Sequence, residues 1–229
     1  MKFDKDFFKE NGYLIIENVF DERECDDLVK SAHQYVINDD YTPLMNKHKN
    51  SDEIFNFISN TKLKFLVGEY FSGKPMGLQT EFFFMPPGTK GFSAHQDNTF
   101  VQAEGATFIS AWVALTDVTQ DNGGLIIWPK SQKEKQLKSE ETLEKKIEDQ
   151  DPNANKTRAI IPDKYKDFSP CINKGDVILL DKWLAHASHS NITNKSRYVL
   201  LCTYIKEKAY FRKGNYAKRE AFSLDEKNE

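Results

Sequence analysis

The sequence has few cysteines and no long apolar run. Its cysteines, Cys25, Cys171 and Cys202, lie far apart, so no disulfide framework and no cysteine-based metal motif is visible. We interpret them as buried reduced thiols. No stretch approaches the roughly 18 apolar residues that cross a bilayer. The N-terminus, MKFDKDFFKENGYLII, is charged and does not resemble a signal peptide. We therefore expect a cytoplasmic protein with no membrane partner.

The chain also lacks a strong charge of either sign. Its net charge is −3 over 229 residues, so no large basic surface and no nucleic-acid partner is implied. The length suits one sizeable core. Aromatic residues make up 13% of the chain, with 17 phenylalanines, which favours a β-rich core around a concave site. A small molecule is the expected partner, and no oligomeric state is implied.

The N-terminal part, about residues 1–73, has mainly helical spacing of its apolar residues. Capping residues and turn signals set the expected boundaries. The pattern predicts helices over residues 4–10, 21–36 and 51–72, a strand over 13–19, and an irregular loop over 39–50.

After Gly73 the pattern changes to short apolar or alternating runs between Gly, Pro and Asn-Gly turns. Strands at this spacing predict a sandwich or barrel over about residues 74–207, within a single domain spanning 1–229. The absence of βαβ alternation argues against Rossmann-type and TIM folds. Residues 132–151 are almost all charged, and we interpret them as a solvated or partly helical insertion, with a lid over the site as the alternative.

One pair of residues in this region suggests a metal site. In His95-Gln96-Asp97, the imidazole and the carboxylate are two positions apart, so on a strand they point to the same face. They would supply two of the three ligands of a facial triad for non-haem Fe(II). The third ligand is expected from His186 or His189, which both follow the predicted strand VILLD. The remaining histidines, His33 and His48, have no such setting.

Arg197 opens the predicted strand RYVLLCTYI. An arginine inside a barrel is costly unless it pairs with an anion. Its planar fork matches a carboxylate, such as the far end of a dicarboxylate bound to the metal. A surface arginine at a strand end is the alternative.

These residues belong to a longer pattern that resembles the phytanoyl-CoA dioxygenase family of Fe(II)/2-oxoglutarate oxygenases. The resemblance runs from about Tyr13 to Ile205. It is most specific in QTEFFFMPPGTKGFSAHQDNTF and in GDVILLDKWLAHASHSNITNKSRYVLL, which contains Gly-Asp, His-x-Ser-x-x-Asn and Arg. The resemblance implies a mainly β protein with N-terminal helices and a double-stranded β-helix core, also called a jelly roll or cupin-like fold.

The resemblance also implies roles for individual residues. His186 begins the His-x-Ser-x-x-Asn motif and becomes the third metal ligand, while His189 falls off the pattern. The 2-oxoglutarate pocket is expected to be lined by Arg197, Ser188, Gln96, Trp112 and, from the preceding strand, Gln79. Candidates for substrate contact are Asn46, His48 and Asn98. Many relatives have Lys where Met85 stands and an apolar residue where Glu81 stands, and we expect both positions to face outward.

The implied activity is oxidation of a small molecule by Fe(II), 2-oxoglutarate and O2, with release of succinate and CO2. Related halogenases have a small residue in place of the carboxylate, so Asp97 favours hydroxylation, with desaturation or ring chemistry as alternatives. Two other classes of function are weighed against it. One is a catalytically silent jelly-roll binding or sensor protein, and the other is a zinc hydrolase using the same ligands.

Overall fold

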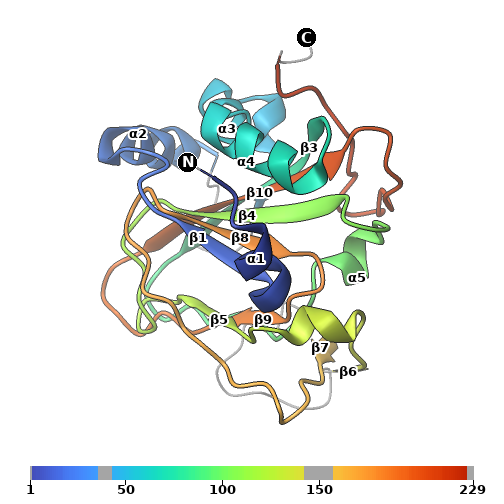
Figure 1. The fold of residues 1–229 in the computed structure, drawn as a ribbon. Coiled ribbons are helices and arrows are strands. Elements are labelled where there is room, and N and C mark those ends of the chain that lie inside the picture. The colour runs from blue at the N-terminus through green and yellow to red at the C-terminus, as the bar shows by residue number, and fades with distance from the viewer. Residues whose placement is uncertain (1, 36–42, 142–156, 226–229) are drawn as a thin grey trace.

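The computed structural model describes residues 2–35, 43–141 and 157–225. Two antiparallel sheets face each other in a jelly roll, and helices cover the outer face of the larger sheet (Figure 1). This architecture confirms the mainly β fold with N-terminal helices that the sequence predicts. The space between the two sheets contains the candidate site.

The larger sheet has six strands in the order β1-β8-β4-β10-β3-β2. Its strands are β1 (Tyr13–Ile16), β2 (Leu44–Met45), β3 (Pro75–Met85), β4 (Phe108–Ala114), β8 (Val177–Asp181) and β10 (Arg197–Lys206). The central pairing of β10 with β3 sets Arg197 opposite Met85 and Leu201 opposite Glu81. Side chains of alternate residues on these strands therefore point into the space between the sheets.

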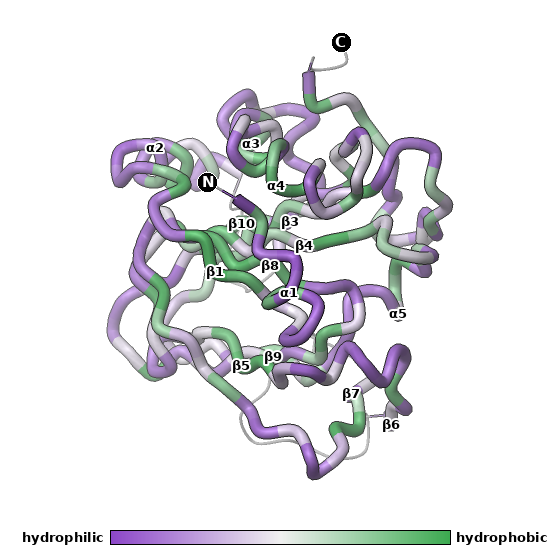
Figure 2. The backbone as a smooth tube through the Cα atoms, viewed as in Figure 1, coloured by the Kyte–Doolittle hydropathy of each residue, from purple (hydrophilic) through white to green (hydrophobic). Residues whose placement is uncertain are grey.

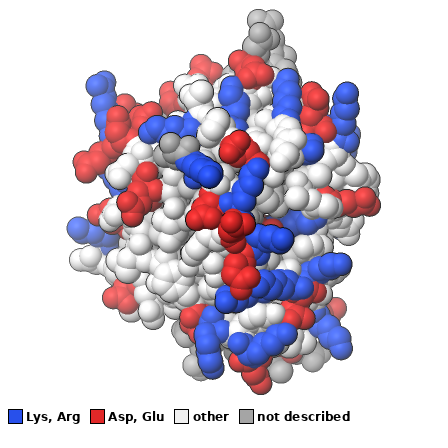
Figure 3. Space-filling model, in the orientation of Figure 1, with Lys and Arg blue, Asp and Glu red and all other residues white. Residues whose placement is uncertain are grey.

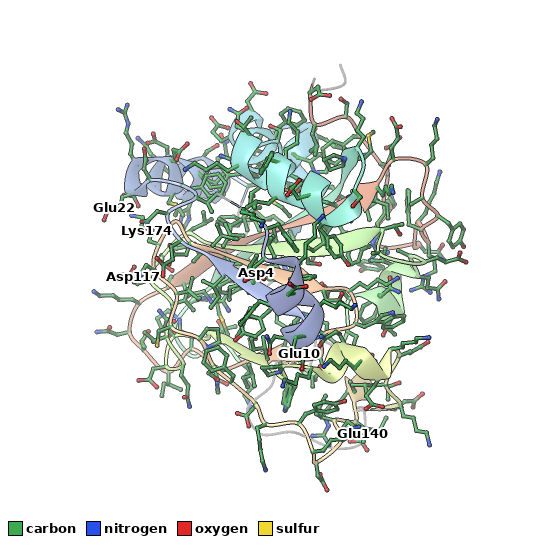
Figure 4. The ribbon with its side chains drawn as sticks, in the orientation of Figure 1. Asp4, Glu10, Glu22, Asp117, Glu140 and Lys174 are labelled. Carbon is green, nitrogen blue, oxygen red and sulfur yellow. The ribbon has the colours of Figure 1, made fainter. Side chains whose placement is uncertain are left out.

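The smaller sheet pairs β5 (Leu125–Ile127) with β9 (His186–Ser188). An isolated bridge extends it by joining His95 to His186 on the side away from β5. A separate hairpin joins β6 (Ser139–Glu141) to β7 (Thr157–Ala159), with Glu140 bonded to Arg158 (Figure 4).

The helices pack on the outer face of the larger sheet. They are α1 (Lys5–Asn11), α2 (Glu22–His33), α3 (Asp52–Ile58) and α4 (Thr61–Phe71), with a short α5 (Asn98–Val101) near the site. Asp4 caps α1 by accepting the Phe7 N–H at 2.9 Å, and Asp21 caps α2 in a reciprocal capping box with Glu24 (Asp4 in Figure 4). Apolar colour concentrates along the strands and on the helix faces turned to them (Figure 2). Burying these faces holds the sheet rigid behind the site.

Two local expectations from the sequence were wrong. The helix predicted over 51–72 is two helices, because Asn60 accepts N–H groups of Lys62 and Leu63 and so starts a new one. The loop predicted over 39–50 contains β2 and the 3-10 turn η1 (Lys47–Lys49) in its described part.

The charged insertion has regular structure up to residue 141. It begins with the 3-10 turn η2 (Ser131–Glu134), and Lys133 pairs with Glu10 of α1 at 2.6 Å (Glu10 in Figure 4). Residues 142–151, the rest of the segment proposed as a lid, lie outside the described residues.

Acidic and basic side chains are interspersed on the face shown in Figure 3. Lys174 is one example, since its Nζ binds Asp26 at 2.5 Å and its backbone N–H donates to Asp117 (Lys174, Asp117 and Glu22 in Figure 4). Within the described chain, every helix is too short or too polar to span a membrane.

Candidate metal centre and cavity

His95 and His186 lie directly opposite each other on neighbouring chain segments. Each donates its backbone N–H to the other's carbonyl oxygen, at 2.8 Å and 3.0 Å. Their rings are 4.2 Å apart between centroids. In an antiparallel bridge, opposed residues project to the same face, so both imidazoles point into the cavity. This bridge is what brings together two residues that are far apart in the sequence.

The hydrogen bonds of the two imidazoles leave the same ring nitrogen of each available for a metal. His95 Nδ1 lies 2.8 Å from the Ser93 carbonyl oxygen, and His186 Nδ1 lies 3.0 Å from that of Leu184. A carbonyl oxygen only accepts, so each Nδ1 carries the proton and each Nε2 keeps its lone pair. Metal-binding histidines are commonly oriented by such a bond.

Asp97 completes the group. Its Oδ1 lies 3.7 Å from His95 Nε2 and 3.5 Å from His186 Nε2, and its Oδ2 accepts a hydrogen bond from Ser110 Oγ at 2.5 Å. Ser110 is on β4, so the larger sheet orients a ligand that faces the smaller one. The three candidate ligand atoms lie within 4.8 Å of one another. They therefore fit one divalent ion, and the predicted convergence of His95, Asp97 and His186 is confirmed.

The reason given for this convergence was partly wrong. His95 forms only an isolated bridge, and Asp97 has helical backbone angles at the start of α5. A turn, not strand alternation, brings the carboxylate back beside the imidazole. His189 lies outside the group, with its Nε2 2.8 Å from Ser169 Oγ.

The electrostatic setting favours metal binding. The pKa of His95 is lowered to about 4, chiefly by burial and also by the neighbouring His186, while Asp97 acts in the opposite direction. A neutral imidazole is the form that binds a metal. His95 is therefore ready to act as a ligand at neutral pH.

A cavity of about 760 Å³ opens beside the three ligands. This volume is within the usual range of small-molecule sites. Most of its walls are apolar, and they include Phe83, Phe92, Phe100, Trp112 and Leu201. Two charged side chains outside the ligand group also line the cavity: Arg197 on β10 and Glu81 on β3, four residues along the strand from Met85, the partner of Arg197. We call the parts of the cavity around them its Arg197 end and its Glu81 end.

At one end, the Arg197 side chain is buried, at 3% exposure. Its Nη2 donates to the Gly123 carbonyl oxygen at 2.7 Å, and the guanidinium lies 5.7 Å from the ring centre of Trp112. Gly123 has a φ of +94°, and a Cβ there would collide with Met85 and crowd Arg197. The turn containing Gly123 thus shapes this end of the cavity.

Ser188 and Trp112, which the sequence predicts for the 2-oxoglutarate pocket, both line the cavity. Ser188 Oγ accepts the Phe92 N–H at 2.8 Å. Gln79 also lines the cavity, but it is six positions along β3 from Met85 and contacts Glu81. Gln96 points elsewhere: its amide binds Lys135 and Trp183 carbonyl oxygens and the Leu137 N–H.

The three candidates for substrate contact have structural partners outside the cavity wall. Asn46 donates to the Ala217 carbonyl oxygen at 2.8 Å. His48 bonds Thr80 at 2.8 Å and stacks on Phe222. Asn98 exchanges hydrogen bonds with the backbone of Ala103 and so closes the turn after α5.

Glu81 and Met85 face inward, so the expectation that they point outward was wrong. Both are on the same side of β3 as Gln79, and Glu81 lines the cavity. Sequence reasoning also missed Ser110 and Arg219, which lines the cavity from the C-terminal segment. Strand alternation counted back from Met85 opposite Arg197 would have found Glu81, whereas nothing in the sequence near Arg219 signals its place.

A model of one protein family matches residues 8–199, and it describes phytanoyl-CoA dioxygenase (PhyH). Phytanoyl-CoA dioxygenase 1 of Oryza sativa subsp. japonica is 28% identical over 150 residues, which are 64% of this chain and 50% of that protein. The peroxisomal phytanoyl-CoA dioxygenase of Rattus norvegicus is 24% identical over 86% of this chain and 66% of its own length. The chain thus spans about half to two thirds of these relatives.

Solved structures share the fold at lower identity. The α-ketoglutarate-dependent epimerase SnoN from nogalamycin biosynthesis superposes with a TM-score of 0.73 at 18% identity, covering 90% of this chain and 83% of that one. EctD from S. alaskensis, solved with 2-oxoglutarate and 5-hydroxyectoine, gives 0.70 at 18% identity, covering 90% and 76%. At this identity the likeness concerns the jelly-roll fold.

Proposed function

The chain belongs to the phytanoyl-CoA dioxygenase family, and on that premise we propose that it is an Fe(II)- and 2-oxoglutarate-dependent hydroxylase of a small molecule. With Fe(II), 2-oxoglutarate and O2 bound, the site would couple decarboxylation of 2-oxoglutarate to succinate with hydroxylation of the substrate. The chain's own residues would bind, orient and shield the reactants.

The observation that carries this proposal is the directed set of three ligand atoms. Both histidines bind a backbone carbonyl through Nδ1 and so present Nε2, and Asp97 binds Ser110 through Oδ2 and so presents Oδ1. Two imidazoles and one carboxylate on one side of an ion leave its other positions open, which suits a non-haem iron oxygenase.

Arg197 and Ser188 would hold the far carboxylate of 2-oxoglutarate. The buried guanidinium can donate two parallel N–H bonds to a carboxylate. Ser188 Oγ already accepts the Phe92 N–H, so its own hydroxyl proton can turn to the ligand. Trp112 would fix the plane of the guanidinium from one side. Gln79 and Gln96 stay predictions for this pocket, and their present partners favour other roles.

The walls would keep water away from the reacting atoms. Phe83, Phe92 and Phe100 line the cavity beside the metal ligands with apolar rings. In such a setting the charged groups interact more strongly with a bound anion than they would in water. Hydroxylation is favoured over halogenation because Asp97 occupies the ligand position that an anion would otherwise need.

Two measurements test the proposal. Under anaerobic conditions, 2-oxoglutarate is titrated calorimetrically into the Fe(II)-loaded protein, and succinate is then measured after oxygen and ascorbate are added with candidate substrates. We expect binding of 2-oxoglutarate that depends on the metal, followed by succinate formation. Absence of both results would remove the proposal.

The same experiment separates the alternatives. A silent binding protein would bind 2-oxoglutarate but form no succinate with any substrate. A zinc hydrolase would bind Zn(II), and substitution of Arg197 would not change its affinity for 2-oxoglutarate. Arg23→Gln, an exposed arginine of α2, is the matched control for substitutions of Arg197.

A further inference from the structure

A carboxylate lies inside the cavity at the end away from Arg197. Glu81 is opposite Leu201 on one side and Met45 on the other, and both of these apolar residues line the cavity with it. Its side chain receives a hydrogen bond from the Gln79 amide. Burial raises the pKa of Glu81 to about 7, and the nearby Asp97 charge adds to the effect. A cation beside Glu81 would stabilise its charged form, which burial disfavours.

An arginine faces the same space from the C-terminal segment. Arg219 is 9% exposed, and its Nη1 donates to the carbonyl oxygens of Phe100 and Arg212, both at 3.3 Å. Because these carbonyl oxygens are neutral, they accept hydrogen bonds from Arg219 but do not neutralise its positive charge. Residues 200–225 lie beyond the part of the chain that the family model matches, which ends at residue 199. Arg219 thus lines the cavity from outside the matched region.

The segment that carries Arg219 is fixed at several points. Phe222 forms a backbone bridge with Gly77 at the far end of β3, where any larger side chain would collide with the Phe222 ring. Asn46 holds the Ala217 carbonyl oxygen, and Glu220 pairs with Lys49 at 3.0 Å. These contacts fix the backbone on both sides of Arg219. The guanidinium is therefore held in place before any ligand arrives.

Each of Glu81 and Arg219 shifts the pKa of the other by its charge. Among the described residues, however, no ion pair joins the two side chains within 4.0 Å. Both also sense the charge of Asp97, so both lie near the metal ligands. Opposite charges that border one cavity without touching leave a gap that a ligand with complementary charges can span.

We propose that this end of the cavity binds a zwitterionic small molecule, with a cationic nitrogen on Glu81 and a carboxylate on Arg219. The proposal rests on the proposed function, since that molecule would be the substrate placed beside the metal. Glu81 is outside the group of candidate ligand atoms, so its role here is recognition. A purely apolar substrate would leave both charges desolvated and unbalanced, which disfavours that class.

Matched probes test this assignment. The probes are β-alanine, 4-aminobutanoate and 6-aminohexanoate, each with the amine and the carboxylic acid of the same chain length. Each is titrated calorimetrically into the anaerobic Fe(II) protein saturated with 2-oxoglutarate. We expect at least one amino acid to bind about tenfold or more tightly than its matched amine and acid, because each charged hydrogen bond contributes about that factor.

Variants assign the two charges separately. Glu81→Gln should reduce the affinity of the best amino acid to that of its matched acid, and Arg219→Gln should reduce it to that of the amine. Arg219→Lys keeps the charge and should give an intermediate value, which separates charge from any loss of folding. Glu207→Gln removes an exposed carboxylate just after β10, away from the contacts that hold Arg219, and is the control that should leave the affinity unchanged.

Two results would overturn the assignment. One is that no amino acid binds the wild-type protein, or that amino acid, amine and acid bind equally. The other is that Glu81→Gln weakens Fe(II) binding, which would make Glu81 part of the metal site. Binding of 2-oxoglutarate in the same samples separates the two proposals: if it persists while the probes fail, only this inference is lost, and if it fails, the proposed function is lost.

Discussion

The two ends of the cavity are built in different ways. At one end, Arg197 projects from the first position of β10 and is framed by β3, β4 and the Gly123 turn, all within the region that the family model matches. At the other end, Arg219 comes from an irregular segment beyond that region and meets Glu81 across the cavity. The first end is part of the sheet, and the second is a separate segment laid against its edge.

On the proposed function, the Arg197 end would hold 2-oxoglutarate and the Glu81 end would hold the substrate. A group that every reaction needs is best held by rigid strands. A group that varies from one substrate to another is more easily supplied by a loop or terminal segment. The metal would contact both 2-oxoglutarate and the substrate, so substitutions of its ligands should affect both, while substitutions at either end should affect one.

The largest effect is expected at the shared centre. Asp97→Ala removes one of three ligands and the only negative charge among them, so Fe(II) affinity should fall by more than about 100-fold, beyond the loss typical of outer partners. Calorimetric Fe(II) titration under anaerobic conditions measures it, with His189→Ala as the control outside the group. Equal Fe(II) affinity in the Asp97→Ala and wild-type proteins would contradict the ligand assignment.

The next largest effect should separate the ends. Arg197→Ala removes the partner of a buried carboxylate and should weaken 2-oxoglutarate binding by about 2–5 kcal/mol, which is at least about 30-fold, while Fe(II) affinity is retained. Arg219→Gln should leave 2-oxoglutarate binding within about twofold of wild type. If both substitutions weaken 2-oxoglutarate equally, the division of the cavity into two ends is wrong.

A smaller effect is expected from the residue that orients Asp97. Ser110→Ala leaves all three ligands in place but removes the hydrogen bond to Asp97 Oδ2, so Fe(II) affinity should fall by about tenfold. The loss should be smaller than that of Asp97→Ala and should be recovered largely by Ser110→Thr, which keeps the hydroxyl. An unchanged Fe(II) affinity in Ser110→Ala would show that Asp97 needs no help from β4.

The sheet and its site could be predicted from the sequence where the pattern is local. The short runs after Gly73 predicted a sandwich or barrel, and the resemblance to the family refined this to a jelly roll and selected His186, which lies beside His95 and Asp97 in the structure. Both rest on residues close in the chain. The break between α3 and α4 could be missed because an apolar periodicity continues through Asn60, whose side chain starts the second helix.

What could not be predicted depends on contacts between distant segments. Gln96 sits between two ligands in the sequence, but its side chain is drawn outward by the carbonyl oxygens of Lys135 and Trp183. Arg219 reaches the cavity on a segment that is held in part by the bridge of Phe222 to Gly77. Asn46 and His48 contact that same segment. No local spacing encodes these pairings.

The smallest expected effect is a change in the pH dependence of protein stability, and it arises from the carboxyl group of Glu81 at the Glu81 end. Since burial raises the pKa of Glu81 to about 7 from its usual 4.5, the folded state keeps a proton that the unfolded state releases between these values. The protonated side chain stabilises the fold fully at low pH, and this contribution is lost as the pH rises through the folded pKa. The metal-free wild-type protein should therefore lose stability from pH 5.5 to 7.5 for this reason.

The Glu81→Gln protein has no titrating group at this position, so its loss of stability between pH 5.5 and 7.5 should be smaller than that of the wild type by about 1 kcal/mol. This value is less than the full pKa shift implies, because solvent reaches the cavity. Urea unfolding of the metal-free proteins at the two pH values measures this difference. Glu220→Gln should follow the wild type, because its carboxylate is exposed beside Lys49. If the stability of Glu81→Gln and of the wild type depends on pH in the same way, Arg219 already neutralises Glu81 in the empty cavity. The Glu81 end would then have no unbalanced charge with which to bind a ligand.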